Sequence, residues 1–300
     1  MALITIFTSP KPFTDPHINE IQRNAILSWI ALGDEVEVLL LGDEEGLGEF
    51  AAEFGIRQIK DIKCNELGTP LVSSLFDTAR ENSNTELLAY VNADIILLPD
   101  FISTSKEMLR QQEKFLLVGQ RYDLDITEEL NFDGNWKKMI EDELKGGGRL
   151  HPPSGSDYFI YTRNVYLKVP DFTIGRAGWD NWFIYHAVTQ PWMAIDVTGS
   201  ITVVHQNHDY SHLPGKKPHY DQPETFENIK LADGRKHMYF LYDVDQRIIN
   251  LKISKKKYDL NRVLRAIERL IYPSGVDPKG FRWRITLWLI RFRNKMASRK

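Results

Sequence analysis

The first 120 residues alternate between short apolar runs and longer segments in which apolar residues recur with helical spacing. The apolar runs have the length of buried strands, and they cover residues 2–7, 35–41, 56–59, 87–98 and 115–119. The segments between them are typical of helices, and they cover residues 15–32, 47–54, 71–82 and 101–112. Strands and helices that alternate in this way predict an α/β fold, with a mostly parallel sheet flanked by helices on both faces.

Three polar segments follow predicted strands, at the edge of the sheet where α/β proteins bind their ligands. They are the loop Thr8-Ser9-Pro10-Lys11-Pro12, the pair Gly42-Asp43, and Asn92-Ala93-Asp94. Asn92 and Asp94 are two residues apart, which in an extended strand puts both side chains on one face. Because burying a carboxylate without a partner is costly, we expect that face to open on a cleft that holds a cation.

The second half of the chain has a different character. Residues 123–145 are acidic and end in three glycines, 146–148, which we expect to form a flexible joint. A turn-rich loop at 151–157 precedes a predicted strand at 158–162, and residues 175–182 lead into a predicted helix. Two short strands are expected at 194–197 and 201–204. A loop containing His205, His208 and His212 is expected to follow them.

The composition bears on the cellular location that we expect. Cys64 is the only cysteine, so no disulfide can form within the chain, and a reducing, cytoplasmic location is expected. The N-terminal apolar run is typical of a strand rather than of a signal peptide. No charge-free apolar run approaches the roughly 20 residues that span a bilayer.

In these motifs and in their order, roughly residues 2–212 resemble the nucleotide-sugar-dependent glycosyltransferases of the GT-A fold. The resemblance implies that the first loop, with Thr8, Pro10 and Lys11, and the acidic Asp43 bind the nucleotide. Asn92-Ala93-Asp94 resembles the DxD motif, which binds the diphosphate through a divalent metal. Asn92 stands in place of the first Asp, so Asp94 is the only carboxylate of this motif.

Two further motifs carry the same resemblance. Trp179-Asp180-Asn181-Trp182 is similar to the acidic motif that supplies the base in inverting members of the family. Asp180 is therefore the expected base, with Trp179 beside it to stack on a sugar and raise the carboxylate pKa. His205 is similar to the histidine that completes the metal shell in several families. The implied metal ligands are Asp94, Asn92 and His205, and the implied metal is Mn²⁺ or Mg²⁺.

Each of these residues also has a simpler interpretation. Asn92 and Asp94 could cap a turn, and Asp180 could cap its helix. The three histidines could be ordinary loop residues, and their spacing would suit zinc only on a helix. Lys11 and Arg121 could meet a diphosphate or remain surface charges, and Asp157 could bind sugar hydroxyls or only form a turn.

The C-terminal segment differs in charge from the rest of the chain. Residues 251–300 contain 15 Lys and Arg residues against three Asp and Glu residues, whereas the first 250 contain 23 basic and 38 acidic residues. Residues 260–271 form an expected amphipathic helix, and residues 279–300 form another in which aromatic and aliphatic residues are bordered by Arg and Lys. This pattern favours an anionic membrane surface as partner, on the cytoplasmic face. Docking on the body of the protein and a homodimer contact are the alternatives. The acidic body argues against nucleic acid.

Together these observations predict a catalytic domain over residues 1–250 and a basic helical tail over 251–300. The nucleotide-binding half would be residues 1–120 and the acceptor half residues 121–250. The expected reaction is metal-dependent, inverting transfer of a hexose-like sugar from a nucleoside-diphosphate sugar to a hydroxyl of a carbohydrate or lipid-linked acceptor, as in polysaccharide biosynthesis. The alternatives are a nucleotidyltransferase of related fold, which would usually have a glycine-rich basic loop after its first strand, and a non-catalytic nucleotide-sugar-binding module.

Overall fold

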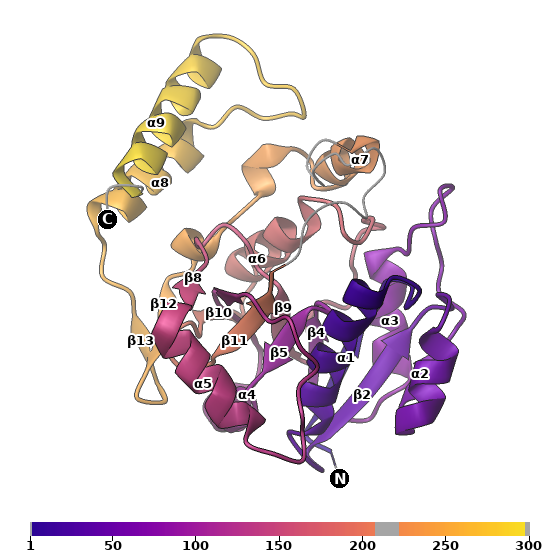
Figure 1. Ribbon diagram of the computed structural model, residues 1–300. Helices are drawn as coiled ribbons and strands as arrows, with labels where there is room; N and C mark the ends of the chain where they lie inside the picture. Colours follow the sequence, from indigo (N-terminus) through magenta and orange to yellow (C-terminus); the bar gives the residue numbers. More distant parts are fainter. Residues whose placement is uncertain (1, 208–221, 298–300) are drawn as a thin grey trace.

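The computed structural model describes residues 2–207 and 222–297 (Figure 1). Its strands are β1 (Ile4–Thr8), β2 (Val36–Leu41), β3 (Arg57–Ile59), β4 (Leu87–Val91), β5 (Ile95–Leu97), β6 (Phe115–Val118), β7 (Tyr122–Leu124), β8 (Arg149–Leu150), β9 (Tyr158–Thr162), β10 (Met193–Asp196), β11 (Val203–Gln206), β12 (Gln246–Ile249) and β13 (Lys252–Lys255). Its helices are α1 (Pro16–Ile30), α2 (Leu47–Phe54), α3 (Val72–Glu81), α4 (Asp100–Gln111), α5 (Trp136–Gly147), α6 (Trp179–Thr189), α7 (Pro223–Leu231), α8 (Leu260–Ile271) and α9 (Phe281–Ala297), with 3₁₀ turns η3 (Arg235–His237) and η4 (Leu241–Asp243).

The central sheet has the strand order β13-β12-β10-β6-β9-β4-β1-β2-β3. All of its paired strands are parallel except where β9 lies between β4 and β6, and where β13 pairs with β12. The segment β3-β2-β1-β4 has the doubly wound order, in which the order of the strands reverses at β1 and the next strand, β4, is added on its other side. The predicted fold class, a mostly parallel α/β sheet flanked by helices with a helical C-terminal extension, is confirmed.

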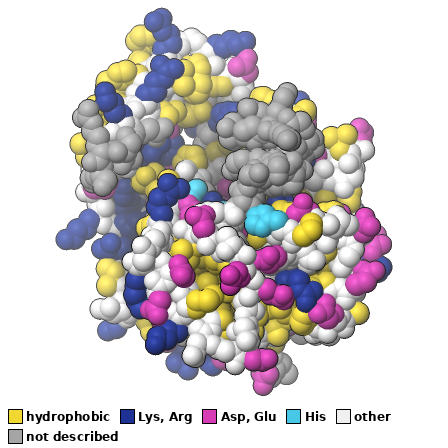
Figure 2. All heavy atoms as spheres, viewed as in Figure 1, with side chains coloured by type: hydrophobic (Ala, Val, Ile, Leu, Met, Phe, Trp, Pro, Cys, Tyr) yellow, Lys and Arg dark blue, Asp and Glu magenta, His cyan; other side chains and the backbone are white. Residues whose placement is uncertain are grey.

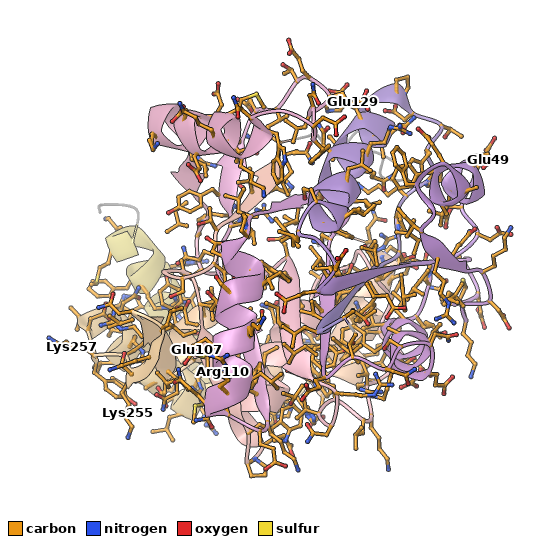
Figure 3. The ribbon with its side chains drawn as sticks, turned by 90° about the horizontal axis from the view of Figure 1, so that it is seen from below. Glu49, Glu107, Arg110, Glu129, Lys255 and Lys257 are labelled. Atoms are coloured by element: carbon orange, nitrogen blue, oxygen red, sulfur yellow. The ribbon has the colours of Figure 1, made fainter. Side chains whose placement is uncertain are left out.

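Helices cover both faces of this sheet because its strands are apolar on both sides. On one face, side chains such as Ile4 and Ile6 of β1 pack with α1, α2 and α4. On the other face, Phe7 of β1 and Tyr90 of β4 pack with α3, α6 and α7. Figure 3 shows α4 crossing beneath the sheet, with its polar Glu107 and Arg110 near the end of the helix. A sheet buried on both faces in this way can open to a ligand only at the ends of its strands.

A second, smaller sheet has the order β5-β11-β7-β8 and packs under α5. Its first strand corrects the expectation of one strand over residues 87–98. The chain leaves the central sheet after Val91, turns at Asn92-Ala93-Asp94 and enters the second sheet as β5. The backbone N–H of Ile95 closes this turn by donating to the carbonyl of Asn92 at 3.1 Å. The apolar run is continuous because both strands are buried, so its hydrophobicity does not reveal the turn.

Two expected boundaries also differ from the structure. Gly146 and Gly147 complete the last turn of α5, and Gly148 caps it by donating its backbone N–H to Leu144 O at 3.0 Å, so these glycines end a helix and are no joint. The domain boundary expected at residue 250 falls in the turn of the β12–β13 hairpin. Because β13 belongs to the central sheet, the helical tail begins at α8.

The tail consists of α8 and α9, which pack against each other beyond the β12–β13 end of the sheet (Figure 1). Figure 1 places this pair at the opposite end of the molecule from α2. Within residues 2–207 and 222–297, no helix has the length and apolar character needed to cross a membrane.

Candidate functional site

The loop after β1 is held in place at the carboxyl edge of the sheet by Gln22, a buried residue of α1. The backbone N–H of Lys11 donates to Gln22 Oε1 at 2.6 Å, and Gln22 Nε2 donates back to the carbonyl of Lys11 at 2.9 Å. The pKa of Lys11 is lowered by burial, while the nearby charge of Asp94 acts in the opposite direction. The loop therefore brings a partly desolvated ammonium group toward the turn between β4 and β5.

Asp94, in the turn just before β5, lies beside His205 of β11, and His205 lies beside Asp123 of β7. The register pairs His205 of β11 with Ile95 of β5 on one side and with Asp123 of β7 on the other. His205 Nε2 lies 3.7 Å from Asp94 Oδ2, and His205 Nδ1 lies 3.7 Å from Asp123 Oδ1. His205 therefore lies within a strand, and the expected loop position after strand 201–204 is wrong. The expected proximity of His205 to Asp94 is present.

Asp123 is buried at the centre of a charged cluster that the sequence did not reveal. Its Oδ2 is 2.9 Å from His151 Nδ1, and Arg121 Nε donates to its Oδ1 at 3.0 Å. Burial by itself would raise the pKa of Asp123, but the hydrogen bonds with His151 and Arg121 outweigh it and lower the pKa overall. Asp123 is therefore a carboxylate held in its charged form beside His205.

Asn92 and Arg121 both bind Asp157. Arg121 Nη1 donates to Asp157 Oδ1 at 2.6 Å, and Asn92 Nδ2 donates to the same oxygen at 3.0 Å. The amide oxygen of Asn92 accepts from the hydroxyl of Tyr90 at 2.9 Å. Among the described residues Asp157 Oδ2 is buried without a hydrogen-bond partner. Asn92 and Arg121 therefore position Asp157, and the guanidinium of Arg121 is already neutralised by two carboxylates.

Asp180 lies in the first turn of α6, next to Trp179, whose ring packs against Tyr90. The helix begins after Gly178, whose φ of 108° is in the left-handed region, and Asp180 Oδ1 accepts from Gly178 N at 3.3 Å. Burial raises the pKa of Asp180 to about 6, although backbone hydrogen bonds from Asn181 and Gly178 oppose it. The negative charge of Asp157 adds to the increase. The N-cap residue is Gly178, so Asp180 is not the cap that the simpler interpretation expected.

Tyr90 connects these acidic groups. Burial raises the pKa of its hydroxyl, and the charges of Asp94, Asp157 and Asp180 raise it further. All three carboxylates therefore lie close enough to act on the same phenol. The strand end of β4, the loop before β9 and the start of α6 thus converge on one acidic region.

Trp179 lies in the core, which does not fit the expected role of its ring as a stacking surface for sugar. Its ring packs 5.1 Å from Tyr90 and 5.4 Å from Phe159, and 5% of the residue is exposed. Trp182 is buried as well, 5.3 Å from Phe172. The tryptophans anchor α6 on the sheet, and their contribution to the site is to desolvate its first turn.

The remaining predicted residues lie around the ends of β1 and β2. Thr8 ends β1 and is buried, with an Oγ1 that has no hydrogen-bond partner among the described residues. Pro10 is also buried. Asp43 is exposed and forms an ion pair with Lys60 at 2.8 Å. A side chain built at Gly42 would lie 3.7 Å from Ser9 Oγ, so the loops after β1 and β2 are adjacent.

The residues present suit a divalent cation only in part. Two ligands that each lie about 2.0–2.2 Å from a cation are roughly 3–4 Å apart, so the Asp94–His205 spacing of 3.7 Å fits. Asn92 is committed to Tyr90 and Asp157. Within the described chain, no group of three or more His, Cys, Asp or Glu side chains is arranged to hold a metal ion. A cation here would need oxygen atoms from a ligand or from water to complete its shell.

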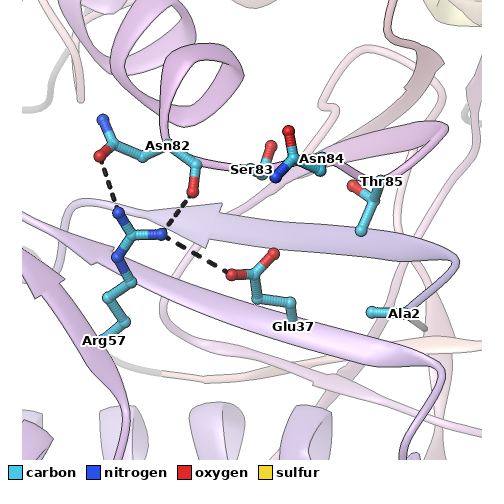
Figure 4. Close-up of a pocket in the computed structure, with 7 residues that line it drawn as sticks. All are labelled: Ala2, Glu37, Arg57, Asn82, Ser83, Asn84 and Thr85. Carbon is cyan, nitrogen blue, oxygen red and sulfur yellow. Dashed lines mark hydrogen bonds and ion pairs between the residues drawn. The ribbon is translucent and has the colours of Figure 1, made fainter.

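His208 and His212 fall outside the described residues, so their expected loop position stays a prediction. A shallow cavity of about 160 Å³ lies at the opposite, amino edge of the sheet, lined by Ala2, Glu37, Arg57, Asn82, Ser83, Asn84 and Thr85. Figure 4 shows that Arg57, the basic residue among those that line the cavity, donates hydrogen bonds to Asn82 and forms an ion pair with Glu37.

No protein-family model matches the sequence, and no curated protein matches it either. Among solved structures, the chain is similar to S. aureus TarS 1-349 in complex with UDP-GlcNAc, with a TM-score of 0.46 and 11% identity over 77% of this chain and 65% of that one. It is also similar to the mannosyltransferase PcManGT from Pyrobaculum calidifontis in complex with GDP-Man and Mn²⁺, with a TM-score of 0.44 and 13% identity over 70% of this chain and 58% of that one. The chain thus spans less than two thirds of either structure. Likenesses at this level identify no substrate.

Proposed function

We propose that the protein is a glycosyltransferase that binds a nucleoside-diphosphate sugar at the carboxyl ends of the neighbouring strands β1 and β4. The observation that carries this proposal is the pairing of Asp94 with His205 at that point, with the partly desolvated Lys11 nearby. Doubly wound sheets bind nucleotides in the crevice at this reversal of strand order. An acid, an imidazole and an ammonium group there suit a diphosphate and its counter-cation.

The donor would lie across the loops at the carboxyl edge of the sheet. Thr8, Pro10 and Lys11 from the first loop and Asp43 from the second would contact the nucleotide. Ala93, which has a small side chain, would let the backbone of the turn approach the diphosphate. Asp94 and His205 would hold Mn²⁺ or Mg²⁺, with phosphate oxygens completing the shell in place of Asn92. Such a cation, when bound, stabilises the negative charge that develops on the leaving diphosphate.

Asp180 is the proposed base for the acceptor. The bond between the anomeric carbon and the diphosphate oxygen breaks, a bond to the acceptor oxygen forms, and the acceptor proton passes to Asp180. A pKa of about 6 suits this role because the carboxylate is ionised at neutral pH and still basic enough to take the proton. Attack from the side opposite the diphosphate would invert the anomeric configuration. Asp157, held by Asn92 and Arg121, would orient sugar hydroxyls of the carbohydrate or lipid-linked acceptor or of the donor.

The test is a panel of nucleotide sugars with Mn²⁺, in which release of the nucleoside diphosphate is measured for the wild type, Asp94→Ala and Asp180→Asn. We expect Asp94→Ala to lose donor binding. Asp180→Asn should keep donor binding and lose transfer by about 10²–10⁴-fold, the usual contribution of a general base. The exposed Asp61, changed to Asn, is the matched control.

Normal turnover by both variants would overturn the assignment of the site. Release of pyrophosphate from a nucleoside triphosphate and a sugar phosphate would instead identify a nucleotidyltransferase. Tight binding of nucleotide sugars without turnover of any kind would identify a binding module.

A further inference from the structure

Helix α8 lies with its charged side toward the protein and its apolar side toward solvent. Its buried side chains are Arg262, Arg265 and Glu268. Its aliphatic side chains Leu260, Val263, Ile267 and Leu270 are exposed, and 79% of Leu270 is accessible. An ordinary surface helix has the reverse arrangement, with its apolar stripe against the core.

Ion pairs hold α8 in this orientation. Arg265 Nη2 donates to Asp243 Oδ2 at 3.0 Å and to the carbonyl of Met238 at 3.0 Å, and its Nη1 pairs with Glu268. Asp243 and Glu268 are both almost fully buried. A buried charge that loses its partner is strongly destabilising. Rotating α8 to bury its aliphatic side chains would therefore lower the stability of the fold. The fold therefore fixes the exposure of the apolar stripe.

Helix α9 also has a buried arginine on its packed side and large apolar residues on its exposed side. Arg293 Nε is 3.2 Å from Glu268 Oε2, so the same buried acid holds both helices, and Thr286 and Leu289 lie on the packed side. The exposed side carries four large apolar residues at helical spacing, Phe281, Ile285, Trp288 and Phe292. Exposed basic residues border them, namely Arg282, Arg284, Arg291 and Lys295.

The surroundings of the two helices are basic as well. Figure 2 shows hydrophobic side chains bordered by Lys and Arg over the α8–α9 tail, whereas acidic side chains are frequent on the body below it. Figure 3 shows Lys255 and Lys257, from the segment that leads into α8, at the outer edge of the molecule near the tail. Exposed apolar residues therefore lie within a strongly positive segment of the chain.

We propose that the outward faces of α8 and α9 dock together on the surface of an anionic lipid bilayer. Trp, Phe and Leu within a border of Arg and Lys match the acyl boundary and the anionic headgroups of such a surface. A second copy of the tail is a poorer partner, because its basic border would repel the identical border of the first. The described helices are unable to span the bilayer, so the contact is with its surface.

Co-sedimentation of the full chain with vesicles tests this proposal, using phosphatidylcholine alone and phosphatidylcholine mixed with phosphatidylglycerol. We expect binding to the anionic vesicles only, and weaker binding at high salt because screening shortens the reach of the basic residues. Leu270→Glu and Trp288→Glu should each lower the partition coefficient about tenfold or more, the loss expected for an apolar side chain that no longer enters the bilayer.

Leu167→Glu is the matched control, because Leu167 is a singly exposed leucine of the body, 63% accessible, and should leave vesicle binding unchanged. Thermal unfolding of each variant checks that the fold is kept. The proposal is overturned if anionic and neutral vesicles bind equally or neither binds, or if both tail variants bind like the wild type. It is also overturned if sedimentation velocity shows a wild-type dimer that Leu270→Glu dissociates. Nucleotide-sugar turnover without vesicles is measured separately, so a failure here leaves the proposed reaction untouched.

Discussion

At the residue scale, the environment of Asp180 decides which chemistry the site can perform. Burial in the first turn of α6 raises its pKa, and the charge of Asp157 raises it further, whereas backbone donors at the helix start oppose both effects. Asp123, in contrast, is held charged by His151 and Arg121. Because the two pKa values are shifted in opposite directions, the two carboxylates can have different roles. Asp180 can accept a proton, and Asp123 remains an anion.

The pKa of Asp180 predicts the pH dependence of transfer. Because its pKa is raised from 3.8 to about 6, the carboxylate form that accepts a proton predominates only above that pH. We expect kcat/KM for transfer to fall about tenfold for each pH unit below 6. Donor binding by Asp180→Asn should show no such decrease at low pH. Initial rates measured from pH 3.5 to 8 check this. A limb near pH 4, or none, would show that another group takes the proton.

At the element scale, the register of the second sheet assembles the site. Asp123 and His205 belong to β7 and β11, and Asp94 directly precedes β5. These segments are far apart in the sequence, and they meet because β11 pairs with β5 on one side and with β7 on the other. Local patterns placed Asp94 within one buried strand over residues 87–98, whereas it lies in the turn between β4 and β5. They missed Asp123 and His151, because their proximity depends on pairings between distant segments that no local period encodes. The only available signal was the i, i+2 spacing of Arg121 and Asp123, the same spacing as in Asn92 and Asp94.

The start of α6 provides a test at this scale. Gly178→Ala forces a φ of 108° on a residue with a Cβ atom, and we expect it to cost about 1–2 kcal/mol of folding stability and to slow transfer by displacing Asp180. Denaturant unfolding and transfer assays measure the two effects. Gly175→Ala is the matched control. Gly175 also has a positive φ, of 68°, so alanine is strained there as well, but its Cβ atom would meet no other atom within 4 Å. Equal transfer rates in the two variants would contradict the positioning role of this turn.

At the scale of the whole molecule, the chain separates an acidic body from a basic tail. The hydrophobic alternation of the first 120 residues predicted the five strands that this part of the chain adds to the central sheet, because strands such as β1, β4 and β6 are buried on both faces. The helical spacing of residues 260–271 likewise predicted an amphipathic helix. Which side of it faces inward was not predictable, because that depends on Asp243, a buried acid in a distant turn that binds Arg265.

The central claim is that Asp94 and His205 hold a divalent cation against a diphosphate at the carboxyl ends of β1 and β4. Calorimetric titration of UDP and GDP into the wild type, Asp94→Asn and the control Asp61→Asn, each with and without Mn²⁺, tests it most directly. We predict that Mn²⁺ tightens nucleotide binding at least about tenfold in the wild type and in Asp61→Asn, and that Asp94→Asn loses this gain. Nucleotide binding that is equally tight with and without Mn²⁺, or that Asp94→Asn leaves unchanged, would contradict the claim.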